Sequence, residues 1–178
     1  MVARKKRRQK DWSETCTFFG TFIEWRHRGV PDKVPKGDEG AFYDAYYFCL
    51  SIDCDGMRAA LGLPEGQKRR IFRTLRKLGL SKLVENTKEA AAAFRKSGLR
   101  LGVGPDWQAV SALMRPFEKV YYRQLRLPAY ARMHRLLSSK AFLPYALNCH
   151  RLDKEGGNPL DPKEWTAKKL KSLEILQV

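Results

Sequence analysis

Four cysteines and three histidines are the residues of this chain that could do chemistry, and their spacing completes no site. Four residues separate Cys49 from Cys54, and Cys149 directly precedes His150. These four could supply a tetrahedral metal site, but no second pair has the short spacing of metal ligands. Reduced, partly buried thiols are the better interpretation. The histidines also lack a carboxylate or nucleophile at a suggestive spacing, so we predict a protein that is not an enzyme and has no cofactor or metal.

Positive charge is concentrated in two segments of the chain. The sequence has 35 Lys and Arg against 19 Asp and Glu, which gives a net charge of +16. Residues 1–10 hold six cations and no acid, and residues 66–151 hold nineteen cations and four acids. Blocks of this kind normally face nucleic-acid phosphates, acidic lipid headgroups or an acidic protein surface. We therefore expect a binding protein.

The N-terminal block reads as a solvated basic arm. It contains no apolar residue between its cations, unlike a secretory signal or a mitochondrial presequence. No apolar run in the chain approaches the roughly 20 residues of a membrane span, so we expect no transmembrane segment. The six cations of the arm are Arg4, Lys5, Lys6, Arg7, Arg8 and Lys10.

The elements that must position these charges are helices. Apolar residues recur at helical spacing over residues 65–78 and 116–125, and an Ala-rich helix is expected from Asn86, as N-cap, to a stop at Gly98. Residues 42–50 are aromatic-rich and fit either a helix or a strand, and Pro116 should bend or restart a helix. We predict an all-α fold of small orthogonal helical domains with an extended basic N-terminal arm. The expected segments are 1–11 (arm), 12–54 (aromatic-rich), 55–98 (basic helices) and 99–178 (C-terminal helices).

Residues 55–80 have the pattern of a helix-turn-helix. A short helix, a Gly-Leu-Pro turn and a longer basic helix occur in that order, as in the DNA-binding core of winged-helix regulators. In that geometry the second helix would enter a major groove, and its cations would contact phosphates or guanines. An ordinary helix pair with a solvated basic face is the better interpretation, because the motif is degenerate. The cations concerned are Lys68, Arg69, Arg70 and Arg73.

A second set of motifs follows in order along the C-terminal half. It begins with Lys77-Leu78-Gly79-Leu80 and the Ala-rich helix, and it continues with Arg126-Leu127-Pro128. A Tyr/Arg-rich helix with Tyr130, Arg132 and Arg135 comes next, and then a turn with Pro162 and Trp165. This order resembles the subunit-seven family of ubiquinol–cytochrome c reductase, whose members are small helical subunits on the matrix side of respiratory complex III.

The resemblance implies a structural role without redox chemistry. The chain would pack on other subunits of the mitochondrial complex, on the matrix side of the inner membrane, and would aid electron transport only by supporting assembly. Its basic helices could also meet anionic lipid headgroups, at about 1 kcal/mol for each Lys or Arg near the surface. The residues that the resemblance assigns to partner contacts are Arg126, Leu127, Pro128, Tyr130, Arg132, Arg135 and Trp165.

An RNA-binding structural protein, such as a subunit of a divergent mitochondrial ribosome, is the alternative. The arm cations Arg4 to Arg8 and the basic block suit phosphate binding by counterion release. Tyr121 and Tyr122 stand beside Arg123 and could stack on unpaired bases. Packing inside the fold is the better interpretation of these rings, because Tyr121 continues a helical apolar stripe. A helix-turn-helix DNA-binding protein is the third class and depends on residues 55–80 alone.

Overall fold

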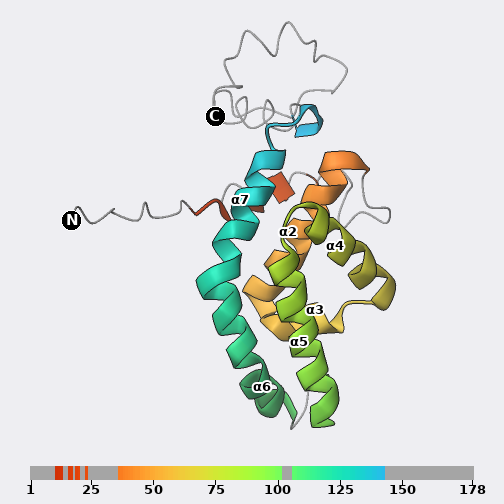
Figure 1. Cartoon of the computed structure of the whole chain (residues 1–178), viewed down its shortest axis with the longest axis vertical. Coiled ribbons are helices and arrows are strands. Elements are labelled where there is room, and N and C mark those ends of the chain that lie inside the picture. The colour runs from red at the N-terminus through yellow and green to blue at the C-terminus, as the bar shows by residue number, and fades with distance from the viewer. Residues whose placement is uncertain are drawn as a thin grey trace, which may run out of the picture.

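The described part of the chain is helical. The computed structural model describes residues 11–13, 16, 17, 19, 20, 23, 36–101 and 106–142. Of these, 86 % are helical and none lies in a strand, which confirms the all-α prediction. No described helix is long and apolar enough to cross a bilayer. The main helices, seen in Figure 1, are α2 (Gly37–Asp55), α3 (Met57–Gly62), α4 (Glu65–Lys77), α5 (Ser81–Ser97), α6 (Asp106–Val120) and α7 (Arg126–Leu136).

Helix α2 lies at the centre of the core. It packs against α3, α4 and α7, so it buries side chains around most of its circumference. A helix buried on all sides has no polar stripe and therefore no amphipathic period. For this reason the sequence pattern of residues 42–50 fits either a helix or a strand. The buried side chains of α2 include Phe42, Tyr43, Asp44, Ala45, Tyr46, Phe48, Cys49 and Ile52.

The short helix α3 receives its N-terminal cap from a different part of the chain. Gly56 separates α2 from α3 with a φ of 74°, a conformation that favours glycine. The next amide, Met57 N–H, donates a 2.9 Å hydrogen bond to Oε1 of Glu118 in α6. A side-chain acceptor at a helix start satisfies a donor that has no partner within the helix. Glu118 thereby ties α6 to the junction of α2 and α3.

A tight turn connects α4 to α5. Gly79 has a φ of 74°, and the Leu80 amide donates a 2.8 Å hydrogen bond to the Leu75 carbonyl. Bonds of this kind close a helix end through a left-handed glycine. Helix α5 then begins at Ser81, so the prediction of Asn86 as its N-cap is wrong. Asn86 is buried inside the helix, and its Nδ2 donates a 3.1 Å hydrogen bond to the Phe117 carbonyl of α6.

Helix α6 continues into α7 through one wide turn. The sequence predicts that the helix bends or restarts at Pro116; this residue lies inside α6 without ending it, so the predicted restart is wrong. The irregularity comes later, as the π-helical turn η1 (Tyr121–Leu125), whose Tyr121 carbonyl accepts a bond from the Arg126 amide. Pro128 follows and has no N–H for the carbonyl four residues before it, so one α-helical bond is missing here in any geometry. Helix α7 thus begins at Arg126, two residues before Pro128.

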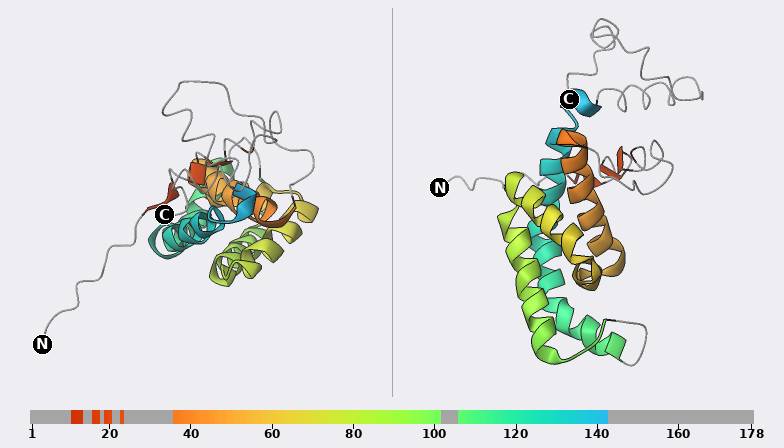
Figure 2. Two further views of the ribbon diagram at one scale, coloured as in Figure 1. Left: turned by 90° about the horizontal axis from the view of Figure 1, so that it is seen from above. Right: turned by 90° about the vertical axis from the view of Figure 1, so that its right-hand side faces the viewer.

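One hydrophobic core joins all of these elements. Its buried members run from Cys16 and Ile23, through α2 to α7, to Phe142 in the short 3-10 helix η2 (Lys140–Phe142). Figure 2 shows α5 alongside the rod formed by α6, η1 and α7, with α2 against the upper half of that rod. The exposed residues of this rod include Arg115, Lys119, Arg123 and Arg132.

Candidate anion-binding surface

Two of the predicted phosphate-contacting cations are engaged inside the chain. The Asp44 carboxylate on α2 is buried, and the Arg70 guanidinium donates to it through Nε at 3.0 Å, with NH2 also 3.0 Å away. Thr74 Oγ1 donates a further hydrogen bond to Asp44 at 3.1 Å. A buried carboxylate needs partners of this kind, because its desolvation is costly. Arg70 therefore holds α4 against α2.

Lys68 is the second engaged cation, and its neighbours on α4 are available. Lys68 Nζ lies 2.7 Å from Glu65 Oε1, and its side chain is only 16 % exposed. Arg69 and Arg73 are exposed, and neither has a carboxylate partner among the residues that the structure describes. The four predicted cations thus divide into two that stabilise the fold and two that face solvent.

Arg126 and Tyr130, predicted to contact a partner, both meet Asp53 of α2. Arg126 Nε donates to the two carboxylate oxygens at 3.2 and 3.1 Å, and the Tyr130 hydroxyl donates to Oδ2 at 2.8 Å. Tyr130 is 1 % exposed, so this ring cannot reach a partner while the fold is intact. Arg126 also lies 2.9 Å from Asp11. The cluster fixes α7 and the segment around Asp11 onto α2.

The π-helical turn is what rotates Arg126 and Tyr130 inward. In an unbroken α-helix, residues four apart share a face, so both would continue the exposed face of Arg115 and Lys119. The wide turn inserts one extra residue, which moves everything after it by about 100° around the axis. Tyr122, Arg123 and Gln124 of the turn are all exposed. The sequence shows no sign of this insertion.

Charge and burial shift several pKa values around the cluster. Burial raises the pKa of Tyr130 far above its usual range, and the nearby Asp53 charge adds to this effect. Burial acts against the charge on Arg126, but the bonds to Asp11 and Asp53 outweigh it and raise the pKa of this guanidinium. Burial also opposes the Asp11 charge, yet hydrogen bonds from Ser13 and Arg126 leave the pKa of Asp11 lowered. Arg126 and Asp11 are thus charged over the neutral range, and the Tyr130 hydroxyl stays neutral and keeps the proton that it donates to Asp53.

Two of the three described cysteines are buried. Burial raises the pKa of Cys16 and of Cys49 to about 12, so neither is a reactive thiolate at neutral pH. Cys54 is exposed. Among the described residues no three His, Cys, Asp or Glu side chains are grouped so that they could hold a metal ion. Cys149 and His150 lie outside the described residues.

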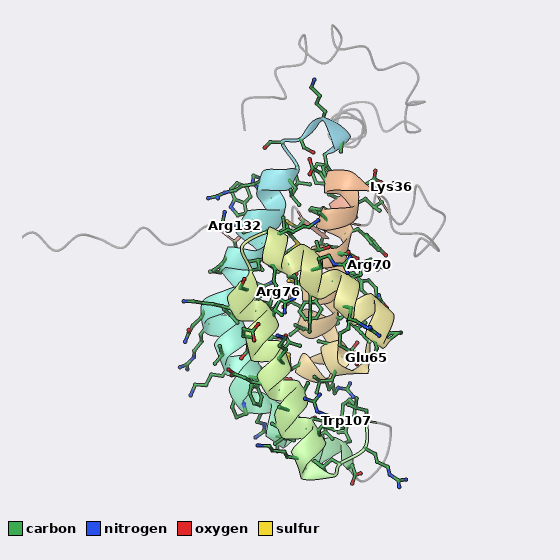
Figure 3. The ribbon with its side chains drawn as sticks, turned by 45° about the vertical axis from the view of Figure 1, so that its right-hand side comes forward. Lys36, Glu65, Arg70, Arg76, Trp107 and Arg132 are labelled. Carbon is green, nitrogen blue, oxygen red and sulfur yellow. The ribbon has the colours of Figure 1, made fainter. Side chains whose placement is uncertain are left out.

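A basic surface forms where the end of α4 meets α7. Arg132, on α7, brings its guanidinium close to the α4–α5 turn: a Cβ on Gly79 would lie 3.8 Å from its NH2. Arg76, in the last turn of α4, has one distant acidic neighbour, Glu85, at 3.9 Å. Figure 3 labels Arg76 and Arg132 on their two helices. We call this set the α4–α7 surface, and its exposed members are Arg69, Arg73, Arg76, Lys77 and Arg132.

The remaining predicted residues fall into three groups. Arg135 is exposed on α7, one turn after Arg132. Leu127 and Pro128 are half-buried in the first turn of α7. Trp165 and the arm cations Arg4, Lys5, Lys6, Arg7 and Arg8 lie outside the described residues.

Comparison with known proteins gives no match. No protein-family model matches the chain, and neither a curated protein nor a solved structure is detectably similar to it. What the chain does must therefore be argued from its own residues.

Proposed function

We propose that the chain is a non-catalytic structural subunit of a larger assembly and that it docks through the α4–α7 surface. The support is the concentration of exposed arginines without strong acidic partners at this surface. Arginine forms planar, two-point contacts with carboxylates and phosphates, which suits a fixed interface. An exposed ion pair contributes at most about 1 kcal/mol, so these arginines have little value for the fold itself.

A bc-type respiratory complex is the assembly that we propose first. One observation carries this choice: Gly79 and Arg132 belong to two separate stretches of the resemblance, and they lie together in space. The exposed residues of the two stretches, Lys77 and Gly79 with Arg132 and Arg135, would then form one contact area. On this proposal the subunit lies on the matrix side of the mitochondrial inner membrane, contacts other subunits and anionic headgroups, and carries no electrons itself.

Native electrophoresis of detergent-solubilised mitochondria that contain a tagged copy tests this function. We expect ribonuclease-resistant migration with cytochrome b and the Rieske protein. A ribonuclease-sensitive particle that contains ribosomal RNA would instead identify the chain as an RNA-binding structural protein. Deletion of residues 1–10 adds a second criterion: incorporation into a respiratory complex should stay near normal, because the docking surface lies elsewhere.

A charge-reversal pair tests the docking surface itself. The double variant Arg76→Glu, Arg132→Glu should lower the tagged copy's share in the large complex severalfold. Lys36→Glu, Lys140→Glu is the matched control, since both lysines are exposed and lie outside the α4–α7 surface. Equal incorporation of the two variants would show that the chain does not dock through the α4–α7 surface.

A further inference from the structure

The outer face of α6 and η1 has a composition unlike that of the α4–α7 surface. Its exposed side chains combine cations with aromatic and amide groups and include no carboxylate. The two acids of α6 are used elsewhere: Asp106 accepts a bond from the Arg100 amide, and Glu118 caps α3. We call this the α6–η1 face, and its members are Trp107, Arg115, Lys119, Tyr122, Arg123 and Gln124.

Three of these residues form a row of positive charge. Arg115, Lys119 and Arg123 are each four positions apart, which places successive charges about 6 Å apart along the helix axis. None of them has a carboxylate partner among the described residues. A row of evenly spaced cations along one rod matches a linear chain of phosphates better than a flat lipid surface, which would favour a broad patch.

Tyr122 provides a fixed aromatic surface within this row. Its side chain is among the exposed large hydrophobic groups, at 45 % exposure. The hydroxyl nevertheless donates a 3.1 Å hydrogen bond to the Ile52 carbonyl, and the ring makes a T-shaped contact with buried Tyr121 at 5.1 Å between ring centres. A ring held in place loses little conformational entropy when a base stacks on it. Its neighbours in the π-helical turn, Arg123 and Gln124, are exposed as well.

A second exposed aromatic stands at the far end of the face. Trp107 is 40 % exposed, and the Arg58 guanidinium lies 3.1 Å from the centre of its ring. Figure 3 shows Trp107 near the end of the molecule opposite Lys36. Tyr122 thus lies within the row of cations and Trp107 lies about two helical turns before it, and tertiary contacts hold both rings in place.

We propose that the α6–η1 face binds single-stranded RNA, with Arg115, Lys119 and Arg123 on successive phosphates and Tyr122 stacked on a base. Aromatic stacking is available to every base, and amide groups such as that of Gln124 can bond base edges. An acidic protein segment could also pair with the cations and pack on the ring, and polyglutamate is the probe that distinguishes it from RNA below. The α6–η1 face is separate from the α4–α7 surface. The proposal for it does not depend on which assembly contains the chain.

The test uses the full chain and a fluorescein-labelled 12-nucleotide oligouridylate, with binding followed by fluorescence anisotropy across a salt series. Tyr122→Leu should weaken binding about tenfold at every salt concentration, because it removes stacking and no charge. Tyr122→Phe keeps the ring and should bind within about threefold of wild type. Urea unfolding of each variant shows whether the fold is kept.

A triple variant tests the row of cations independently of Tyr122. In the variant Arg115→Gln, Lys119→Gln, Arg123→Gln, the negative slope of log affinity against log salt should become shallower by about 2. The control Lys36→Gln, Lys82→Gln, Lys140→Gln removes the same charge from exposed positions off this face and should leave the slope nearly unchanged.

Three results would overturn the proposal. Wild-type affinity of the Tyr122→Leu variant would exclude base stacking on this ring. Equal salt slopes for the two triple variants would exclude phosphate binding by the row of cations. A double-stranded RNA, polyglutamate or phosphatidylserine vesicles that bind as tightly as the oligouridylate, with the same dependence on the row, would show that the face recognises negative charge in general. None of these results depends on whether the chain enters a respiratory complex.

Discussion

Asp53 receives hydrogen bonds from two side chains of α7 and is the residue through which that helix is fixed to the centre of the core. Its carboxylate is 17 % exposed, whereas that of Asp11, the other partner of Arg126, is 50 % exposed. A shielded ion pair is costly to break on one side, because the remaining charge keeps its desolvation penalty. Asp53 therefore contributes more to stability than Asp11, although both carboxylates pair with Arg126.

Replacing Asp53 should accordingly cost more than replacing Asp11. We expect Asp53→Asn to lower the free energy of unfolding by about 3 kcal/mol, and Asp11→Asn by less than about 1 kcal/mol. Urea unfolding at pH 7 measures both. Equal losses would mean that the exposed pair is as important as the shielded one.

The hydrogen bond from Arg126 to Asp11 predicts that the contribution of Asp11 to stability depends on pH. Its pKa is lowered in the folded chain, so its contribution to stability is present above the ordinary value of 3.8 and disappears as the pH falls through the lowered pKa. The stability difference between wild type and Asp11→Asn should shrink as the pH decreases from 5 to below 3.8. A difference that stays constant over this range would contradict the assignment.

At the scale of elements, the turn between α4 and α5 and the turn η1 decide how the surfaces are presented. The first depends on the left-handed backbone of Gly79, and the second on one extra residue in a helical rod. Both features act on whole helices, because a change in a connecting turn rotates or displaces every side chain that follows it.

Gly79→Ala should destabilise the chain although a new Cβ would make only an ordinary van der Waals contact with Arg132. Side chains rarely adopt a φ of 74°, and the cost is about 1 kcal/mol. Gly66→Ala is the matched control: Gly66 lies in α4 with nothing within 4 Å of a new Cβ, so alanine should stabilise the helix by about 0.5–1 kcal/mol. Thermal unfolding of the two variants should therefore shift the midpoint in opposite directions.

Deletion of Gln124 should be tolerated. Removing one residue from η1 would turn the wide turn into an ordinary α-helical turn and leave α7 facing the core as before. We expect a cooperatively folded chain that loses less than about 2 kcal/mol. Deletion of Ala131 is the control: it would rotate Arg132 and all later residues of α7 by about 100° and should abolish cooperative unfolding. Circular dichroism during urea titration distinguishes the two.

At the scale of the whole molecule, the described surface carries more unpaired cations than ion pairs. Most of the exposed cations on α4, α6, η1 and α7 have no acidic partner among the described residues, and the chain carries a net charge of +16. Such repulsion opposes the compact state and is weakened by salt. The surface charge therefore lowers the stability of the isolated chain.

Sodium chloride should therefore stabilise the isolated chain. We expect the urea midpoint to rise between about 20 and 300 mM salt, because screening over roughly one Debye length relieves more repulsion than attraction. Sodium perchlorate at equal ionic strength checks that the anion is not acting by specific binding. A falling midpoint would mean that ion pairs such as Arg70 with Asp44 dominate over the unpaired surface cations.

The sequence by itself determined the helical class and the breaks between several helices. Apolar residues at helical spacing predicted α4, and glycine predicted the end of α5, because both signals act within one or two turns of the chain. The net charge and its segregation also follow from the sequence alone. These properties need no information about what lies across the fold.

The tertiary structure alone decided which cations are available. Arg70 meets Asp44 across 26 positions, Arg126 meets Asp53 across 73, and Tyr130 turns inward after a wide turn that no residue pattern announced. Asn86 likewise bonds a carbonyl on another helix instead of capping its own. Cations look alike in sequence, and pairing with a carboxylate that is distant in sequence separates those that hold the fold from those that face solvent. The physical reason is that desolvation and pairing depend on neighbours in space.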